Sequence, residues 1–419
     1  MQPSPQQADA LEKTARWMLD PTSQVLCLFG YAGTGKTTLA KLLVENSDRV
    51  WLFISYTGKA CAVMRSKGCS GAQTAHSLIY APSGESRQKE IELLERRIAH
   101  LNEKILSKKG EPQDLRELEQ RTKQLTEARS DNRPHFSLWP FSRLADEDVA
   151  GVVADEISMI DDKLGRDLES FGKKILAMGD PAQLPPVGAG GYYTRRMPDI
   201  MLTEVHRHAR DSGILALATH VREEHLLSSW AEEREDVTVA SVRQLGGDRL
   251  RELMMSADQI LVGRNQTRKK FNARYREIAG RRSAAPEPGE RLMCLRNDRE
   301  YGVYNGSQWT VIECDADLQT QTMDLVLRPD DGSEEIRVPA WMHHLTGREA
   351  MLTEMGPMRR EMCEFTWAYN CTVHKAQGSQ WDNVVLFDES ASFGGGSEFA
   401  RRWLYTGVTR AAKKLTVVT

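Results

Sequence analysis

Short continuous apolar runs alternate along the chain with segments of helical spacing. The first run, at residues 25–29, leads directly into glycines and is followed by a helical pattern over residues 37–43. Similar runs predict further strands at residues 50–55, 149–154, 174–178, 259–262, 384–387 and 415–418. Because strands that are apolar on both faces are typical of parallel sheets covered by helices, the pattern predicts an α/β fold.

Residues 83–130 break this pattern, because they are highly charged and poor in glycine. Their apolar positions follow an alternating spacing of three and four, at 91, 94, 98, 101 and 105 and again at 115, 118 and 125 with Thr122 between the last two. Gly110 and Pro112 separate the two sets. The spacing predicts two helices that fold back as an antiparallel hairpin. A solvated and partly disordered charged insertion is the alternative.

A second change of composition begins near residue 287, where short alternating segments are separated by Asn-Gly and Asp-Asp-Gly turn signals. This pattern predicts a small β-barrel inserted into a second α/β core. The chain then divides into a first core (1–82 and 131–199), the helical hairpin (83–130), a second core (200–288 and 365–419) and the barrel (289–364).

Composition changes this picture little. The formal net charge of -3 leaves any nucleic-acid surface to a local groove. No stretch approaches the roughly 20 apolar residues that span a bilayer, and the amino terminus lacks the pattern of a signal peptide. The seven cysteines form no C-x-x-C pair, and their odd number favours reduced thiols. We therefore expect a cytoplasmic protein that does not contact membranes.

Residues 30–37 read GYAGTGKT and fit the phosphate-binding pattern G-x-x-x-x-G-K-[ST], between a predicted strand and a predicted helix. Glycines allow backbone N–H groups to turn toward phosphate oxygens, and the helix N-terminus adds positive potential. Lys36 would neutralise the β and γ phosphates, and Thr37 would hold Mg²⁺. The predicted nucleotide contacts are Gly30, Gly33, Thr34, Gly35, Lys36, Thr37 and Thr38.

Two carboxylates follow a buried apolar run at residues 152–154. Asp155, at the tip of this predicted strand, would bind Mg²⁺ through water. Glu156 would orient and deprotonate the attacking water. Together with the phosphate loop, this pair predicts a nucleotide hydrolase that uses ATP and Mg²⁺.

The segment LAMGDPAQLPPVG at residues 176–188 resembles superfamily 1B helicases, the group of RecD-like and Dda-like enzymes. The resemblance implies two RecA-like parallel-sheet cores with ATP between them. Gln183 would sense the γ phosphate, since an amide can both donate to phosphate and accept from water. Gln7 resembles the family's adenine-reading glutamine. Arg207 and Arg410 lie in segments that resemble the two arginine-finger motifs, where a fixed bidentate cation stabilises the transferring phosphoryl group.

Two further segments, at residues 56–60 and 72–77, resemble the family's nucleic-acid-contacting motifs in the first core, and residues 372–380 resemble the motif that links the ATP cleft to the strand in the second core. They imply contacts that position a strand without reading its sequence. The family often has an acidic residue where this chain has Gln380. Leu184-Pro185-Pro186 follows the sensor glutamine, where relatives that move in the opposite direction have a stacking aromatic. The implied strand contacts are Thr57, Lys59, Thr74, His76, Thr372 and His374.

The resemblance implies an ATP-dependent DNA helicase that moves 5′ to 3′ on single-stranded DNA, with residues 83–130 in the position of the strand-separating pin. The barrel would guide the strand or dock a partner. Two alternatives remain: a translocase that remodels nucleoprotein with little unwinding, and an ATP-switched loading factor. The residues do not decide between DNA and RNA. Implied partners are single-stranded DNA, junctions with duplex, and replication or recombination proteins, and nothing requires more than a monomer.

Overall fold

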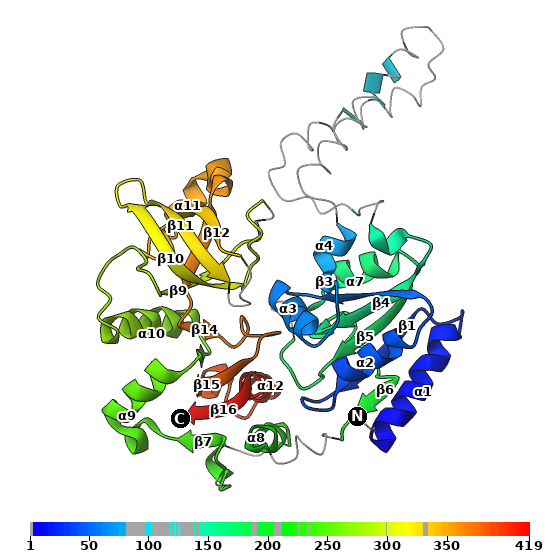
Figure 1. Cartoon of the computed structure of the whole chain (residues 1–419), viewed down its shortest axis with the longest axis horizontal. Helices are drawn as coiled ribbons and strands as arrows, with labels where there is room; N and C mark the ends of the chain where they lie inside the picture. Colours follow the sequence, from blue (N-terminus) through cyan, green and yellow to red (C-terminus); the bar gives the residue numbers. More distant parts are fainter. Residues whose placement is uncertain are drawn as a thin grey trace.

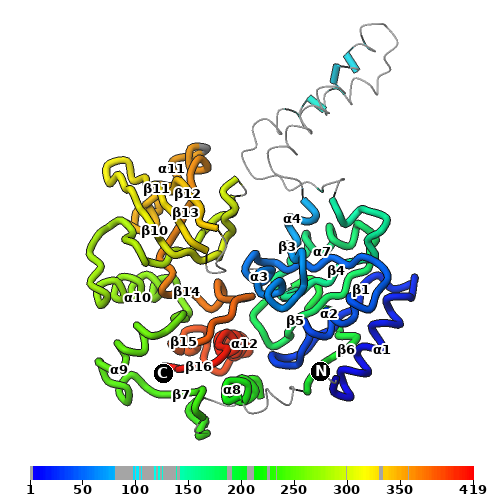
Figure 2. The backbone as a smooth tube through the Cα atoms, viewed as in Figure 1, coloured from blue at the N-terminus to red at the C-terminus, as the bar shows by residue number. Residues whose placement is uncertain are grey.

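The computed structural model describes residues 3–80, 142–185, 191–204, 212–223, 227–232, 234–298, 300–329 and 334–419, with isolated positions between 98 and 138. Figure 1 shows two sheets side by side, with a barrel next to the second. The first residues of the chain, in blue, and the last, in red, belong to different cores (Figure 2). The two cores therefore lie next to each other, one built around the start of the sequence and the other around its end.

The first core is a six-stranded parallel sheet in the order β3-β2-β4-β5-β1-β6. Helices α1, α2 and α3 pack on one face, and α4 and α7 pack on the other. Leu26 and Leu28 point to the first face, whereas Cys27 and Phe29 point to the second. Strand β1 is thus buried on both sides, which explains its continuous apolar run. The elements are β1 (Val25–Gly30), β2 (Val50–Ser55), β3 (Gln73–Thr74), β4 (Val149–Asp155), β5 (Lys174–Gly179), β6 (Ile200–Leu202), α1 (Pro5–Leu19), α2 (Lys36–Glu45), α3 (Gly58–Ser66), α4 (Ala75–Ile79), α7 (Asp162–Glu169), and the 3-10 turns η1 (Arg143–Ala145) and η2 (Ile157–Met159).

The second core is a five-stranded parallel sheet in the order β14-β8-β15-β16-β7. Helices α8 and α12 cover one face, where Trp403 is fully buried, and α9 and α10 cover the other. The elements are β7 (Val237–Ala240), β8 (Gln259–Val262), β14 (Asn370–Thr372), β15 (Trp381–Phe387), β16 (Ala411–Val418), α8 (Gly213–Arg222), α9 (Val242–Ser256), α10 (Asn265–Ile278), α12 (Glu398–Val408), and the 3-10 turns η4 (Leu227–Ser229) and η6 (Ser390–Phe393).

The barrel closes in the order β10-β11-β12-β13-β9, and its interior is filled by apolar side chains such as Val311, Leu325 and Phe365. It leaves the second core after α10 and returns to it at β14. The elements are β9 (Arg291–Cys294), β10 (Gln308–Asp317), β11 (Thr322–Pro329), β12 (Ile336–Trp341), β13 (Cys363–Trp367), α11 (Met351–Glu354) and the 3-10 helix η5 (Gly356–Glu361).

The predicted fold class is confirmed in its two parallel-sheet cores and its closed barrel. All seven predicted strands are present. Within the described residues, no helix has both the length and the apolar character needed to cross a bilayer. Of the hairpin predicted at 83–130, the described positions (98, 99, 101, 102, 105, 118, 121, 122 and 125) are helical. The predicted pairing of two helices lies outside the described residues.

Two strands extend beyond the residue ranges predicted for their domains. Strand β6 pairs in parallel with β1, so the first core continues past residue 199 to Leu202. Strand β13 pairs with both β9 and β12, so the barrel continues past residue 364 to Trp367. In both places the pairing with a strand distant in sequence, rather than local composition, sets the boundary.

Candidate nucleotide site and nucleic-acid groove

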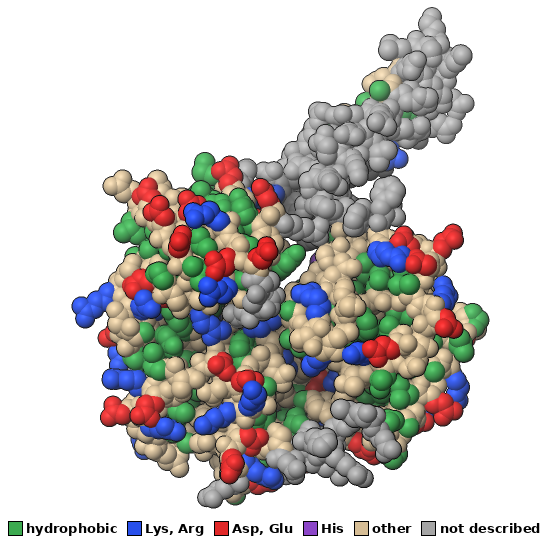
Figure 3. Space-filling model, in the orientation of Figure 1, with side chains coloured by type: hydrophobic (Ala, Val, Ile, Leu, Met, Phe, Trp, Pro, Cys, Tyr) green, Lys and Arg blue, Asp and Glu red, His purple; other side chains and the backbone are tan. Residues whose placement is uncertain are grey.

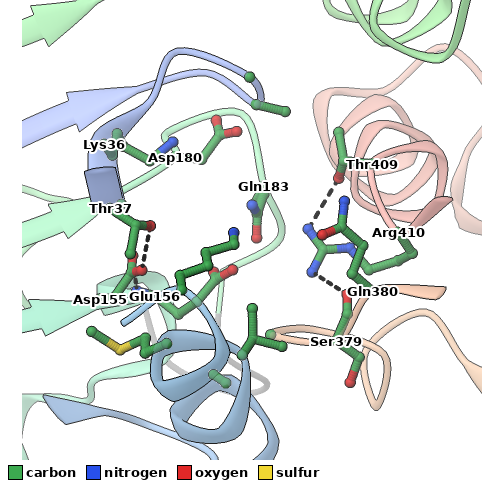
Figure 4. A pocket seen from close by; sticks show the side chains of 18 of the residues that line it. Lys36, Thr37, Asp155, Glu156, Asp180, Gln183, Ser379, Gln380, Thr409 and Arg410 are labelled. Atoms are coloured by element: carbon green, nitrogen blue, oxygen red, sulfur yellow. Dashed lines mark hydrogen bonds between the residues drawn. The ribbon is translucent and has the colours of Figure 1, made fainter. Parts of the chain in front are cut away.

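The phosphate loop connects β1 to the start of α2 at Lys36. Gly33 and Gly35 have φ angles of 77° and 80°, in the left-handed region that favours glycine. The loop therefore turns tightly and brings the N-terminus of α2 to the edge of the cleft, as Figure 4 shows. A helix N-terminus reached in this way is suited to bind phosphate.

Lys36, Thr37 and Asp155 lie together below this loop. Lys36 Nζ donates to the carbonyl oxygens of Gly30 at 2.6 Å and Tyr31 at 3.0 Å. Thr37 Oγ1 donates to Asp155 Oδ2 at 3.1 Å. A hydroxyl beside a carboxylate is an all-oxygen donor set, which fits Mg²⁺ shared with nucleotide phosphates. The structure thus brings together the two residues that the sequence predicted for the metal.

Glu156 follows β4 and has the positive φ of 54°, which is uncommon for a residue with a side chain. Its N–H donates to Asp155 Oδ1 at 2.9 Å, which holds the turn. Burial raises the pKa of Glu156, and Asp155 adds to this effect, while Arg410 and Lys36 act in the opposite direction. A carboxylate with a raised pKa is a better proton acceptor, as a general base requires.

Gln183 contributes a polar group that the protein itself does not satisfy. Its side chain is only 7% exposed, and its Oε1 has no hydrogen-bond partner among the residues that the structure describes. Buried polar atoms are normally hydrogen-bonded, so an unmatched one at the edge of a cavity points to an external partner. This placement agrees with a contact to phosphate or to the attacking water.

Arg410 approaches the same cavity from the second core, directly after α12. Its Nε donates to Thr406 O at 3.0 Å, Nη1 donates to Ser379 O at 3.1 Å and Nη2 donates to Thr409 Oγ1 at 3.1 Å. The guanidinium is thereby fixed in orientation, and Figure 4 shows it facing Gln183 and Glu156 across the cleft. A prearranged cation of this kind can stabilise charge that develops during phosphoryl transfer.

These side chains line one cavity of about 350 Å³ between the two cores. The first core supplies most of the wall, and the second supplies the segments 378–380 and 409–410. Met64 on α3 and Lys67 directly after this helix also line it, which the sequence did not predict. The lining residues are Ala32, Gly33, Gly35, Lys36, Thr37, Thr38, Ala60, Val63, Met64, Lys67, Asp155, Glu156, Gly179, Asp180, Gln183, Gly378, Ser379, Gln380, Thr409 and Arg410.

Hydrogen bonds join the cores beside this cavity. The hydroxyl of Tyr405 accepts from Ala32 N at 3.0 Å and donates to Asp180 Oδ2 at 2.7 Å. Leu184 N donates to Thr406 Oγ1 at 2.9 Å, and Gln377 Nε2 donates to Leu184 O at 2.9 Å. The loop that carries Gln183 is therefore held at both ends by the second core. No sequence signal singled out Tyr405, although it lies in the same motif as Arg410.

A larger cavity of about 760 Å³ forms a groove between the two cores and the barrel. Five of the six predicted strand contacts line it: Thr57, Lys59, Thr74, His76 and His374. Thr372 does not, because its side chain is buried and its Oγ1 accepts from Lys375 N at 3.4 Å. The sequence also missed the wall that the barrel supplies, at residues 295–298 and 304–306 and at Arg360.

The rings of Tyr56, Tyr304, His76 and His374 line this groove together with the cationic residues Lys59 and Arg296. Lys59 Nζ lies 4.0 Å from the centroid of the Trp381 ring, and His76 meets Tyr56 edge-on at 5.5 Å. His374 stacks on Phe399, with ring centroids 6.0 Å apart. Such surfaces suit a single strand, whose phosphates need positive charge and whose bases stack on flat rings.

Comparison with known proteins places this geometry in a family. A family model described as an AAA domain matches residues 2–241, more than half of the chain, and one described as a UvrD-like helicase C-terminal domain matches residues 368–418. The ATP-dependent RecD2 DNA helicase of Deinococcus radiodurans is 26% identical over 280 residues. The ATP-dependent DNA helicase Pif1 of Bdellovibrio bacteriovorus is 23% identical over 277 residues. The chain belongs to the superfamily 1B helicases.

The likeness to known superfamily 1B helicases is partial in sequence. The match to RecD2 covers 62% of this chain and 35% of that protein, and the match to Pif1 covers 56% of this chain and 60% of that protein. The chain thus spans between about a third and three-fifths of the length of these curated relatives. A crystal structure of Bacteroides Pif1 in complex with ADP-AlF3 and ssDNA superimposes with a TM-score of 0.54 at 16% identity, covering 100% of this chain and 92% of that one. This likeness shows the fold alone.

Three predicted nucleotide contacts, Gln7, Gly30 and Thr34, do not line the nucleotide cavity. Gly30 ends β1, and Thr34 is buried with its Oγ1 donating to Tyr31 O at 2.9 Å. Gln7 caps α1 with Ser4, whose N–H donates to Gln7 Oε1 at 3.0 Å, and Gln7 Nε2 donates to Thr34 O at 2.9 Å. Its side chain supports the phosphate loop and does not line the cavity, so its contact with adenine stays a prediction. Arg207 lies outside the described residues.

Proposed function

We propose that this chain hydrolyses ATP in the cleft between its cores and uses the energy to move 5′ to 3′ along single-stranded DNA, unwinding duplex as it goes. ATP and Mg²⁺ are the cofactors of the proposed reaction. Thr37 and Asp155 would hold Mg²⁺, which neutralises charge on the transferring phosphoryl group.

The observation that carries this proposal is the shared cavity. Lys36, Glu156 and Gln183 reach it from the first core, and Arg410 reaches it from the second. Neither core alone holds a complete set of groups for phosphoryl transfer. Binding of ATP would therefore favour a closed arrangement of the two cores, and loss of the γ phosphate would release it.

The loop after β14, which contains Gln377 and Ser379, links the nucleotide cavity to the groove. Ser379 lines both cavities, and Gln377 in the groove donates to Leu184, next to the sensor Gln183. A change in the contacts of Gln183 would thus reach the residues that hold the strand. This connection supports a motor in which hydrolysis and grip on the strand are coupled.

The direction of movement and the choice of DNA rest on resemblance. Leu184 and Pro185 follow the sensor glutamine, in place of the aromatic typical of relatives that move 3′ to 5′. The curated relatives are named DNA helicases, and structures of Pif1 that share this fold contain ssDNA or concern unwinding of forked dsDNA. Single-stranded DNA and its junctions with duplex are therefore the proposed substrates.

Two partial duplexes, one with a 5′ tail and one with a 3′ tail, test the proposal. With ATP and Mg²⁺, only the duplex with the 5′ tail should be separated. Preference for the 3′ tail would refute the proposed direction. If the chain displaces streptavidin from a biotinylated single strand but separates neither duplex, it is a translocase rather than a helicase.

A further inference from the structure

A third concave site lies on the outer side of the second core, where α10 meets the root of the barrel. Its cavity measures about 370 Å³ and is rich in cationic side chains. Lys and Arg side chains also gather on the surface around α10 in the face that Figure 3 presents. We call this site the basic cavity, and define it by Arg268, Lys269, Arg276, Arg281, Arg282 and His344.

Two buried arginines of the basic cavity differ in their partners. Arg276 forms a bidentate pair with Glu290, with distances of 2.7 and 3.0 Å, and its guanidinium lies 3.9 Å from the Trp367 ring centroid. Arg268 is 9% exposed, yet its Nε and Nη1 donate only to neutral oxygens, Asn265 Oδ1 at 3.3 Å and Thr366 Oγ1 at 3.0 Å. No carboxylate in the described parts of the chain pairs with Arg268. An arginine stays charged at neutral pH, so its burial leaves a cation without a counterion.

Arg268 lines the basic cavity, and one nitrogen of its guanidinium is not bonded by the described part of the protein. Its Nη2 has no acceptor among the described residues, and it is not one of the polar atoms that are sealed from solvent. Arg282 is exposed and likewise forms no ion pair within the described ranges. In contrast, Arg281 pairs with Glu287 at 2.7 Å, and Lys269 pairs with Glu349. Two cationic groups are thus available to an external anion.

The basic cavity is attached to the segment that lines the groove. Asn272 on α10 accepts from Asn370 N at 2.9 Å, which ties the helix to β14. The loop after β14 carries His374 and Lys375 into the groove. Burial lowers the pKa of Lys375, and the nearby charge of Arg268 lowers it further. Arg268 therefore lies directly behind a wall of the strand groove.

We propose that the basic cavity binds a backbone phosphate of the nucleic-acid strand outside the groove, with Arg268 and Arg282 as its main contacts. The planar guanidinium presents paired N–H groups that match phosphate oxygens. The cavity is large enough for a nucleotide and too small for a folded partner. This inference rests on the proposed function, because it extends the length of strand that the protein holds.

A ladder of oligothymidylates from about 4 to 16 nucleotides, measured by fluorescence anisotropy without ATP, tests the proposal. The wild-type chain should show a gain in affinity at the length that first reaches the basic cavity. In Arg268→Gln and in Arg282→Gln this gain should shrink by roughly three- to tenfold, and the slope of log affinity against log salt should fall by about 1. Binding of the shortest oligonucleotides that fill the groove should not change.

Lys270→Gln is the matched control, because it removes one positive charge from the same helix at an exposed position that does not line the cavity. Arg282→Gln covers the possibility that Arg268→Gln fails to fold, since Arg282 is exposed. An identical ladder in all four proteins would overturn the proposal. The proposal would also be overturned if the ladder is unchanged and polyglutamate competes for a site that requires Arg268. That result would assign the cavity to an acidic peptide. If the wild-type chain binds no oligonucleotide of any length, the proposed function fails instead.

Discussion

The turn after β1 and the turn after β8 are built alike, since each leads from a buried parallel strand through glycine into a helix. They differ in their backbone N–H groups, because those of the first turn are open to an external anion and those of the second bind a carboxylate of the protein. In the first core the N–H groups of Gly33 and Gly35 have no acceptor within the described part of the chain. In the second core Glu389 fills the corresponding position at the start of α10. Its Oε2 accepts from Gly263 N at 2.6 Å and from Arg264 N at 3.1 Å.

Glu389 is held as a carboxylate by these contacts. Although burial raises its pKa, hydrogen bonds from Thr267 Oγ1 at 2.6 Å and from the two N–H groups lower it below the usual value for glutamate. The protein thus supplies its own anion at a place where the first core can accept a phosphate. A strand-turn-helix unit therefore binds nucleotide only where the chain leaves the helix N-terminus unfilled.

Removing the cation at each turn should give the largest contrast between them. Lys36→Ala should abolish ATP hydrolysis and weaken nucleotide binding, because Lys36 is the main cation beside the phosphate loop. Arg264→Ala at the second turn is the matched change, and should leave ATPase activity within about twofold of the wild-type chain. Steady-state phosphate release and binding of a fluorescent nucleotide measure both effects. Comparable losses in the two variants would show that the second turn also takes part in catalysis.

Arg410→Ala tests whether the second core completes the site of the first. We expect hydrolysis to fall by about 10³-fold, the lower range for an arginine finger, while ATP still binds to the first core. The buried guanidinium donates to Thr406 and Ser379, so its loss could also loosen the fold. Thermal unfolding of the variant checks this point. A fall of less than tenfold in a stable variant would remove Arg410 from the catalytic set.

Glu156→Gln should reduce hydrolysis by about 10²-fold or more and keep ATP binding, as expected for loss of a positioned general base. Because burial raises the pKa of Glu156, the wild-type rate should decline on acidification at a higher pH than an ordinary glutamate would allow. The base is active when deprotonated, so the rate is lost as pH falls through this raised pKa. A pH–rate profile of the wild-type chain under single-turnover conditions measures this decline at acidic pH. If the residual activity of Glu156→Gln declines with the same midpoint, the decline belongs to the titration of another group.

The candidate catalytic residues of the first core could be predicted because each is marked by its immediate neighbours in the sequence. Lys36, Thr37, Asp155 and Glu156 are each marked by the strand or glycine next to them, and the structure brings all four together. The contacts between the cores could not be predicted in this way. Tyr405 and Asp180 are 225 positions apart, and no periodicity in either segment reports the distance between them.

Short elements and side-chain directions were also beyond the sequence. Strand β6 has three residues, too few for a recognisable pattern, and is recognised only by its pairing with β1. The segment that contains Thr372 lies beside the groove, yet Thr372 itself is buried in β14. Motif resemblance therefore identifies the segment near a site, whereas the backbone conformation determines which side chains of that segment reach the cavity.

Tyr405→Phe tests the two hydrogen bonds by which the second core contacts the first, at Ala32 in the phosphate loop and at Asp180. The change removes a hydrogen bond to the buried Asp180 and leaves Ala32 N without its acceptor. We expect DNA-stimulated hydrolysis to fall by roughly tenfold, the loss expected for one hydrogen bond to a charged group, with a smaller effect on the basal rate. Trp403→Phe on the same helix, which packs in the core away from the cavity, is the control for general loosening. Equal reduction of basal and stimulated rates would show that Tyr405 does not act through closure.

Glu389→Gln should have the smallest effect on hydrolysis and act on stability instead. The variant keeps the shape of the side chain and loses the charge that two N–H groups and Thr267 recognise, which should cost about 1–3 kcal/mol of unfolding free energy. Its ATPase activity per folded molecule should stay within about twofold of the wild-type value. Because hydrogen bonds hold the pKa of Glu389 below its ordinary 4.5, its contribution is complete above about that pH. It is then lost as pH falls further through the lowered pKa of the folded state. Urea unfolding followed by circular dichroism at neutral pH and near pH 4 measures this difference, which should narrow on acidification. A gap that stays constant between the two pH values would mean that the charge of Glu389 is not what fills the second turn.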